Sequence, residues 1–105
     1  MDIGKTIISL RKQQGLSQKK LAELTGISAN ALCRIEKGYS FPSKKNIKAI
    51  CSSLRVPTAY LLLKSLTDDD VPKEKLSIFK AFQIPMLEIF EKEELFVFDK
   101  KNEDD

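Results

Sequence analysis

The chain contains no histidine among its 105 residues. This absence removes the general base of Ser–His–Asp and Cys–His catalysis and the commonest ligand of zinc sites. The sequence also has no GxxxxGK phosphate loop and no cluster of acidic residues with a pattern that places them in a core. We therefore expect a protein that is not an enzyme and that uses no metal ion and no cofactor.

Cysteines and long apolar runs are also scarce. The two cysteines, Cys33 and Cys51, are 18 positions apart and form no CxxC pattern, which argues against a disulfide scaffold and fits a reducing cytosol. No apolar run approaches the length of about 18 residues that a membrane-spanning helix needs. The first residues lack the apolar stretch and small-residue cleavage site of a secretory signal. We expect a cytoplasmic protein with no membrane association.

The charged residues that are present are distributed unevenly. Residues 1–66 hold 12 Lys or Arg and 3 Asp or Glu, whereas residues 67–105 hold 6 and 12. A basic first part favours a nucleic-acid-binding face, and an acidic second part indicates a different task. We therefore divide the chain into a DNA-binding domain, residues 1–66, and a second segment, residues 67–105, with an acidic linker, a helical dimerisation or partner segment and a frayed tail.

Apolar residues in the first part recur at helical spacing in five short runs. Ser17 and Ser28 are suitable N-caps for the second and third runs, and Gly26 ends the second. A Pro-Ser pair ending at Ser43 begins the fourth helix, and Pro57 begins the fifth. Five helices within about 64 residues predict a compact all-α bundle with short connections.

The segment from Gln18 to Lys37 predicts two short helices joined by a tight turn. Gly26 can adopt the positive φ that such a turn requires, and the small side chain of Ala22 permits close approach of the two helices. This pattern is typical of a helix-turn-helix, in which the second helix, about residues 29–37, enters the major groove. Four apolar residues are expected to point inward and set the angle between the helices: Leu21, Ile27, Leu32 and Ile35.

The stretch GLSQKKLAELTGISANALCRIEKG, followed by FPS and another amphipathic helix, resembles the lambda-repressor-like, Cro/Xre-type transcriptional regulators. The resemblance covers about residues 3–64 and rests on the LSQ motif, the A-x-x-x-G-I spacing and the R-I-E-K-G ending. It implies an all-α fold, with a five-helix lambda-repressor-like DNA-binding domain and a C-terminal helical extension. Such regulators usually bind near-palindromic operators as dimers.

The resemblance also implies which side chains read DNA bases. Ala29, Asn30, Cys33 and Arg34 match the outward face of the recognition helix. Asn30 suits a bidentate contact to adenine, and Arg34 suits one to guanine. Ala29 stands where the family commonly has Gln, so it offers a methyl contact to thymine in place of a hydrogen bond.

Other positions match phosphate-binding and structural roles. The expected phosphate contacts come from Gln18, Lys37, Lys44 and Lys45. Gln18 also matches a side chain that braces the recognition helix. Arg11 and Glu36 match a partly buried ion pair that ties the first helix to the end of the recognition helix. This pair is expected to position the recognition helix without touching DNA.

The C-terminal segment contains more large apolar residues than a solvent-exposed extension would. The acidic stretch 67–74 predicts a loop into a helix that begins near Pro72, and Pro85 is expected to break or kink that helix. Residues 95–98 form an apolar run that fits either a strand or a helix end. A dimer or partner interface is expected to bury Leu76, Phe79, Phe82, Ile89, Phe90, Phe96 and Phe98, although packing against the first domain is an alternative.

These observations predict a sequence-specific regulator that binds double-stranded DNA. The favoured form is a dimeric repressor whose recognition helices enter inverted half-sites about 34 Å apart. The first alternative is an antitoxin-type autoregulator whose C-terminal segment binds a partner protein. The second alternative is a protein-interaction module with a relict helix-turn-helix, an interpretation that only Ala29 supports.

Overall fold

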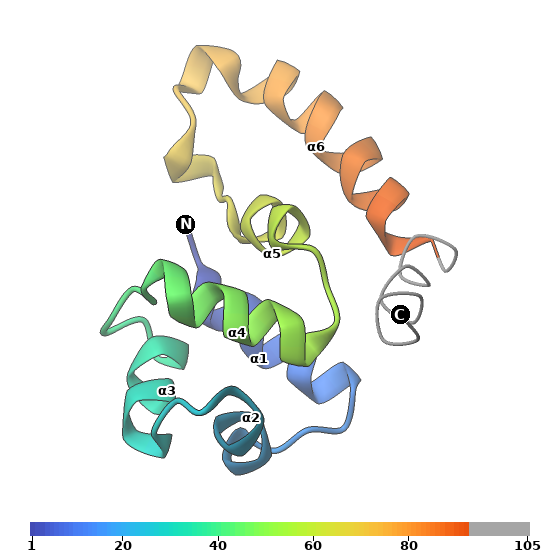
Figure 1. The fold of residues 1–105 in the computed structure, drawn as a ribbon. Coiled ribbons are helices and arrows are strands. Elements are labelled where there is room, and N and C mark those ends of the chain that lie inside the picture. Colours follow the sequence, from blue (N-terminus) through green and yellow to red (C-terminus); the bar gives the residue numbers. More distant parts are fainter. Residues whose placement is uncertain (93–105) are drawn as a thin grey trace.

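The computed structural model describes residues 1–92, and every regular element in this range is a helix (Figure 1). The all-α expectation is therefore confirmed. The expectations for residues 95–98 and for the tail fall outside the described residues. The α-helices are α1 (Ile3–Gln13), α2 (Gln18–Thr25), α3 (Ala29–Glu36), α4 (Lys44–Leu54), α5 (Thr58–Ser65) and α6 (Leu76–Glu91), with short 3₁₀ helices η1 (Asp68–Asp70) and η2 (Lys73–Lys75) before α6.

Local capping chemistry accounts for the boundaries of the first helices. The hydroxyls of Ser17, Ser28 and Ser43 each accept a hydrogen bond at 3.0–3.1 Å from the backbone amide three residues ahead. Each bond satisfies one of the amides that a helix start leaves unpaired. Gly26 ends α2 with φ of 76°, a left-handed conformation that glycine adopts without steric cost. The turn between α2 and α3 is thus the one that the sequence predicts.

The hydrophobic core lies among α1 to α5. The four residues expected to point inward from the helix-turn-helix are buried, and so is Ala22. Both cysteines are free thiols, and burial raises the pKa of Cys51, which is a packing residue. The buried apolar set is Ile3, Ile7, Leu10, Leu21, Ala22, Ile27, Leu32, Ile35, Ile50, Cys51, Leu54, Tyr60 and Leu61.

Helix α1 and the end of α3 approach each other closely at Gly4. A Cβ atom added at Gly4 would lie 2.5 Å from the carbonyl oxygen of Glu36 and 2.6 Å from that of Ile35. Both neighbours are backbone atoms, which cannot move aside as the end of a flexible side chain can. Only glycine therefore permits this packing distance between α1 and the end of α3.

The C-terminal segment differs from expectation in two respects. The 67–74 stretch forms η1 and most of η2 where a loop was predicted, so α6 begins at Leu76 and not near Pro72. Pro85 lies inside α6, which continues without interruption to Glu91, so the expected break at Pro85 is wrong. The proline removes one amide from the helix ladder, and its ring crowds the carbonyl group of Ala81. Contacts with α5 on both sides of Pro85 hold the helix together.

Helix α6 packs against α5 at the end of the molecule opposite α2 and α3 (Figure 1). The amide nitrogen of Gln83 donates to the carbonyl oxygen of Leu63 at 2.9 Å. The hydroxyl of Tyr60 donates to Glu91 at 2.9 Å, and its ring meets Phe90 edge-to-face with centroids 6.1 Å apart. One side of α6 is therefore docked on the same chain. None of the helices within residues 1–92 combines the length and apolarity needed to cross a bilayer.

Candidate nucleic-acid interface

The four residues expected to read bases lie on one side of α3. Ala29, Asn30 and Arg34 are exposed, and Cys33 is half-buried. Their spacing of one, three and one positions keeps them on a common helix face. The opposite face of α3 is buried in the core. The structure thus brings these side chains together on an accessible surface.

A buried polar network fixes the orientation of α3. Arg11 donates from Nε to Oε2 of Glu36 at 2.7 Å and from Nη2 to Oε1 at 2.9 Å. The side chains of Arg11 and Glu36 are only 12% and 2% exposed, so this bidentate pair is shielded from water. The hydrogen bonds that Arg11 donates to Glu36 raise the pKa of Arg11, which therefore stays charged. The pair joins the last turn of α1 to the last residue of α3.

Gln18 joins the same network. Its amide nitrogen donates to Oε1 of Glu36 at 2.9 Å, which ties the first residue of α2 to the end of α3. A side-chain amide carries two donor hydrogens, so one remains for a second acceptor. The half-buried Gln18 therefore braces the recognition helix and keeps a donor that suits a phosphate oxygen.

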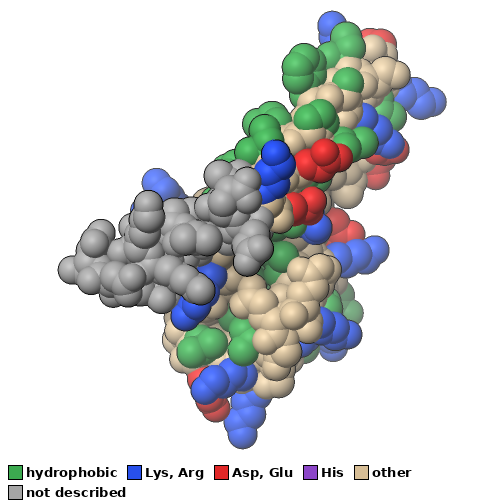
Figure 2. Space-filling model, turned by 90° about the vertical axis from the view of Figure 1, so that its right-hand side faces the viewer, with side chains coloured by type: hydrophobic (Ala, Val, Ile, Leu, Met, Phe, Trp, Pro, Cys, Tyr) green, Lys and Arg blue, Asp and Glu red, His purple; other side chains and the backbone are tan. Residues whose placement is uncertain are grey.

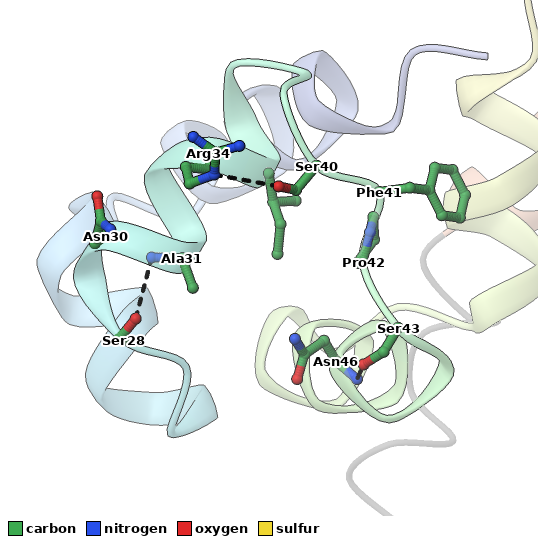
Figure 3. A pocket seen from close by; sticks show the side chains of 10 residues that line it. Ser28, Asn30, Ala31, Arg34, Ser40, Phe41, Pro42, Ser43 and Asn46 are labelled. Atoms are coloured by element: carbon green, nitrogen blue, oxygen red, sulfur yellow. Dashed lines mark hydrogen bonds between the residues drawn. The ribbon is translucent and has the colours of Figure 1, made fainter.

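A hollow of about 370 Å³ separates α3 from the start of α4 (Figure 3). Asn30 and Arg34 border it from α3, and Ser43 and Asn46 border it from α4. The ring of Phe41, in the connecting loop, points away from the space between the two helices (Figure 3). The lining combines polar side chains that can donate hydrogen bonds with four apolar residues, and it contains no acidic side chain. Such a lining suits a negatively charged backbone.

The three lysines expected to hold phosphates stand beside this surface. Lys37 caps the end of α3, and Lys44 and Lys45 are the first two residues of α4. All three are exposed, and their ammonium groups pair with no other side chain among residues 1–92. The structure thus places positive charge at the end of α3 and at the start of α4.

The loop between α3 and α4 contains two residues for which the sequence pattern assigned no role. Arg34 donates from Nε to the hydroxyl of Ser40 at 3.3 Å, and its guanidinium lies 5.8 Å from the centroid of the Tyr39 ring. Tyr39 is 68% exposed although it is a large aromatic residue. The available signal in the sequence was the pair of aromatic residues, Tyr39 and Phe41, within three positions of the glycine that ends the motif, since loop tips normally carry polar side chains.

The residues expected at a dimer or partner interface separate into two groups on α6. Leu76, Phe79 and Phe90 are half-buried, and Phe90 packs against the core. Phe82 and Ile89 are 66% and 51% exposed. Phe96 and Phe98 lie outside the described residues.

Two further exposed residues of α6, Ile78 and Met86, belong with Phe82 and Ile89. The four positions follow one another at intervals of four, four and three, so they form one row along the helix. We name this set the α6 row. Figure 2 shows hydrophobic side chains on the surface of the upper end of the molecule, where Figure 1 places α6. The predicted interface included Phe82 and Ile89 but not Ile78 and Met86, because the sequence pattern did not separate the side of α6 that packs on α5 from the exposed side.

Comparison with known proteins supports the assignment of α2 and α3 as a helix-turn-helix. The helix-turn-helix family matches residues 7–61. The chain is 46% identical over 54 residues to the antitoxin PezA of Streptococcus pneumoniae serotype 4, a match that covers 51% of this chain and 34% of that protein. It is 29% identical over 92 residues to the cryptic phage CTXphi transcriptional repressor RstR of Vibrio cholerae, which covers 87% of this chain and 78% of that repressor. The chain thus spans about a third of the antitoxin and most of the repressor.

The family match covers more than half of the chain and includes the helix-turn-helix itself. The folded elements in the same range are five helices around one core, with an exposed recognition helix flanked by lysines. The chain therefore belongs to the helix-turn-helix family of lambda-repressor-like, Xre-type DNA-binding transcriptional regulators.

Proposed function

We propose that the protein is a cytoplasmic, sequence-specific repressor that binds double-stranded DNA as a dimer and inserts α3 into the major groove. The exposed face of α3, held in place by the Arg11–Glu36 pair, carries this proposal. Asn30 reads adenine and Arg34 reads guanine, while Ala29 and Cys33 make apolar contacts at the groove edge. Phosphate contacts come from Gln18, Lys37, Lys44 and Lys45.

Replacing Arg34 and Lys44 by alanine should have different consequences. Arg34→Ala is expected to reduce discrimination at one base pair by about 1–3 kcal/mol, because a bidentate base contact is lost. Lys44→Ala should weaken binding to all sequences alike and lower the slope of affinity against salt by about one. Fluorescence anisotropy with a duplex selected from a random library, and with its single-base variants, measures both effects at several salt concentrations.

Three results would count against this assignment. Equal losses on selected and random duplexes for Arg34→Ala would remove Arg34 from the set of base readers. A loss for Lys44→Ala that is confined to one base pair would contradict its phosphate role. Failure of the wild-type protein to bind any duplex at low salt would favour the protein-interaction module.

We infer that the α6 row pairs with the row of a second copy of the chain. Its four side chains, Ile78, Phe82, Met86 and Ile89, lie open to solvent on a helix whose other side is already docked on α5. Full burial of an exposed side chain of this size contributes about 1.5–3 kcal/mol, and each of these four, already partly covered, contributes a part of that amount. Helix α6 and α3 lie at opposite ends of the molecule, so a partner on α6 does not cover the recognition helix (Figure 1). A dimer also supplies the second half-site that useful selectivity requires.

Phe82→Glu should disrupt this dimer. The dissociation constant is expected to rise roughly 30-fold or more, because a central aromatic anchor is replaced by a charge. Phe82 is 66% exposed, so the helix content measured by circular dichroism should stay unchanged. Sedimentation equilibrium over a range of protein concentrations measures the dimer constant.

The matched control is Ile84→Glu. Ile84 is 55% exposed on the same helix, but it is two positions from both Phe82 and Met86 and therefore faces another side. This variant should dimerise as the wild type does. Equal dissociation of both variants, or dimerisation of Phe82→Glu at wild-type strength, would contradict pairing through the α6 row.

The second candidate function is an antitoxin-type autoregulator. Two observations favour it: the similarity to a protein named an antitoxin, and the open α6 row itself. In this case the row binds a different protein. A wild-type chain that stays monomeric at high concentration, and that co-purifies with the product of an adjacent gene unless Phe82 is replaced, would establish this candidate over the dimeric repressor.

A further inference from the structure

We propose that Tyr39 and Ser40 are positioning residues that hold Arg34 in the geometry for reading guanine. The inference rests on the proposed DNA-binding function and adds a determinant of base preference that lies outside the recognition helix. Gly38 has φ of 82°, and this turn directs the chain back over the last turn of the helix. The amides of Tyr39 and Ser40 then donate to the carbonyl oxygen of Arg34 at 2.9 and 3.3 Å.

The side chains of the same two loop residues engage the guanidinium of Arg34. Its Nε–H donates to the Ser40 hydroxyl at 3.3 Å, as Figure 3 shows, and its central carbon lies 5.8 Å from the centroid of the Tyr39 ring. The Tyr39 ring attracts the Arg34 guanidinium cation. The hydrogen bond to the Ser40 hydroxyl restrains the orientation of the guanidinium plane. Arg34 is therefore held from two directions by residues that are also bonded to its own carbonyl group.

This arrangement leaves the part of Arg34 that reads a base available. A guanidinium has five N–H donors, and Ser40 accepts from only the Nε–H. A bidentate contact to guanine N7 and O6 requires two donors, which the terminal nitrogens can provide. An arginine side chain normally loses much rotamer freedom when it binds, so restraint before binding reduces that entropic cost. The loop thereby favours the bidentate contact with guanine, which requires the planar guanidinium of Arg34 to be held at a fixed angle.

The exposure of Tyr39 supports a role of this kind. The ring is 68% exposed and does not belong to the hydrophobic core, so core packing does not account for its position. Among the described residues, the only ring interaction of Tyr39 is with Arg34. Ser40 is half-buried and lines the hollow between α3 and α4 beside Arg34. Both side chains therefore lie at the candidate interface and point to its central arginine.

The experiment is a selection from 30-base-pair duplexes with a randomised centre, using the full chain, followed by sequencing. The base pair that depends on Arg34 is first defined as the one whose preference disappears in Arg34→Ala. Ser40→Ala and Tyr39→Leu are each expected to reduce the preference at that same base pair roughly fivefold, the effect of losing one modest polar contact. Preferences at the other base pairs should remain at the wild-type level.

Conservative variants and a matched control separate positioning from a structural role. Ser40→Thr keeps the hydroxyl and Tyr39→Phe keeps the ring, so both should retain the preference for guanine. Ser52→Ala, at an exposed position of α4 away from Arg34, is the control for serine removal. Thermal unfolding midpoints should agree among these variants, since neither Tyr39 nor Ser40 belongs to the core.

Each alternative outcome leads to a definite conclusion. An unchanged preference in both Ser40→Ala and Tyr39→Leu overturns the positioning role, and so does an equal loss at every base pair. A preference lost equally in Ser40→Thr also overturns it, because the hydroxyl would not be the group that matters. Absence of any enriched sequence for the wild-type chain is a different failure, since it refutes the proposed function on which the inference rests.

Discussion

Glu36→Ala is expected to lower the free energy of unfolding by about 3–5 kcal/mol, the usual cost of removing one partner of a buried ion pair. The Glu36 carboxylate accepts two hydrogen bonds from Arg11 and one from Gln18, and its side chain is only 2% exposed. Its removal leaves the positive charge of Arg11 buried without its partner. Urea denaturation followed by circular dichroism measures the loss.

The matched control is Glu23→Ala, an exposed glutamate of α2, which should change stability by no more than about 0.5 kcal/mol. A double variant with Arg11→Met and Glu36→Leu should be more stable than Glu36→Ala alone, because no charge remains buried. A Glu36→Ala protein as stable as the control would show that the pair contributes little to folding. Its role would then be confined to the orientation of α3.

Gly4→Ala is expected to destabilise the protein by about 1–3 kcal/mol, the range for overpacking a closely packed contact. Within most helices the same change stabilises by about 0.5–1 kcal/mol, because glycine loses more backbone entropy than alanine on folding. The sign reverses here because the new methyl group would overlap the carbonyl oxygens of Ile35 and Glu36. Helix α1 must then move away from the end of α3, so DNA affinity should fall as well.

Denaturation curves for Gly4→Ala and for Ser9→Ala test this expectation. Ser9 is exposed on α1, so its replacement should be neutral or slightly stabilising through the higher helix propensity of alanine. A stabilising effect of Gly4→Ala would mean that α1 and α3 can separate without cost, and the close approach at Gly4 would then have no role in positioning the recognition helix.

The order and starting points of the first five helices followed from the amino-acid sequence. Ser17, Ser28 and Ser43 begin helices through bonds that span only three residues, and Gly26 ends α2 through its own backbone conformation. Interactions of this range depend on neighbouring residues, so a sequence pattern contains all of the information they require. The exposed face of α3 was equally predictable, because helical periodicity separates it from the buried face.

The C-terminal segment of the chain was less predictable from local patterns. Pro85 does not interrupt α6, because α5 supports the helix through Gln83 before the proline and Phe90 after it. The apolar residues of α6 divide into a docked side and an open row, and that division depends on where α5 lies. No periodicity within α6 specifies which of its apolar sides meets the rest of the molecule.

The same distinction holds at the candidate interface. The sequence alone indicated a basic domain, a helix-turn-helix and the side chains on its outer face. The resemblance had already implied that Gln18 braces the recognition helix, and the tertiary structure identified Glu36 as its partner. The structure also added the close approach at Gly4 and the contact of Tyr39 and Ser40 with Arg34. Capping and periodicity are local, whereas packing distances and side-chain networks join segments whose proximity arises only when the chain folds.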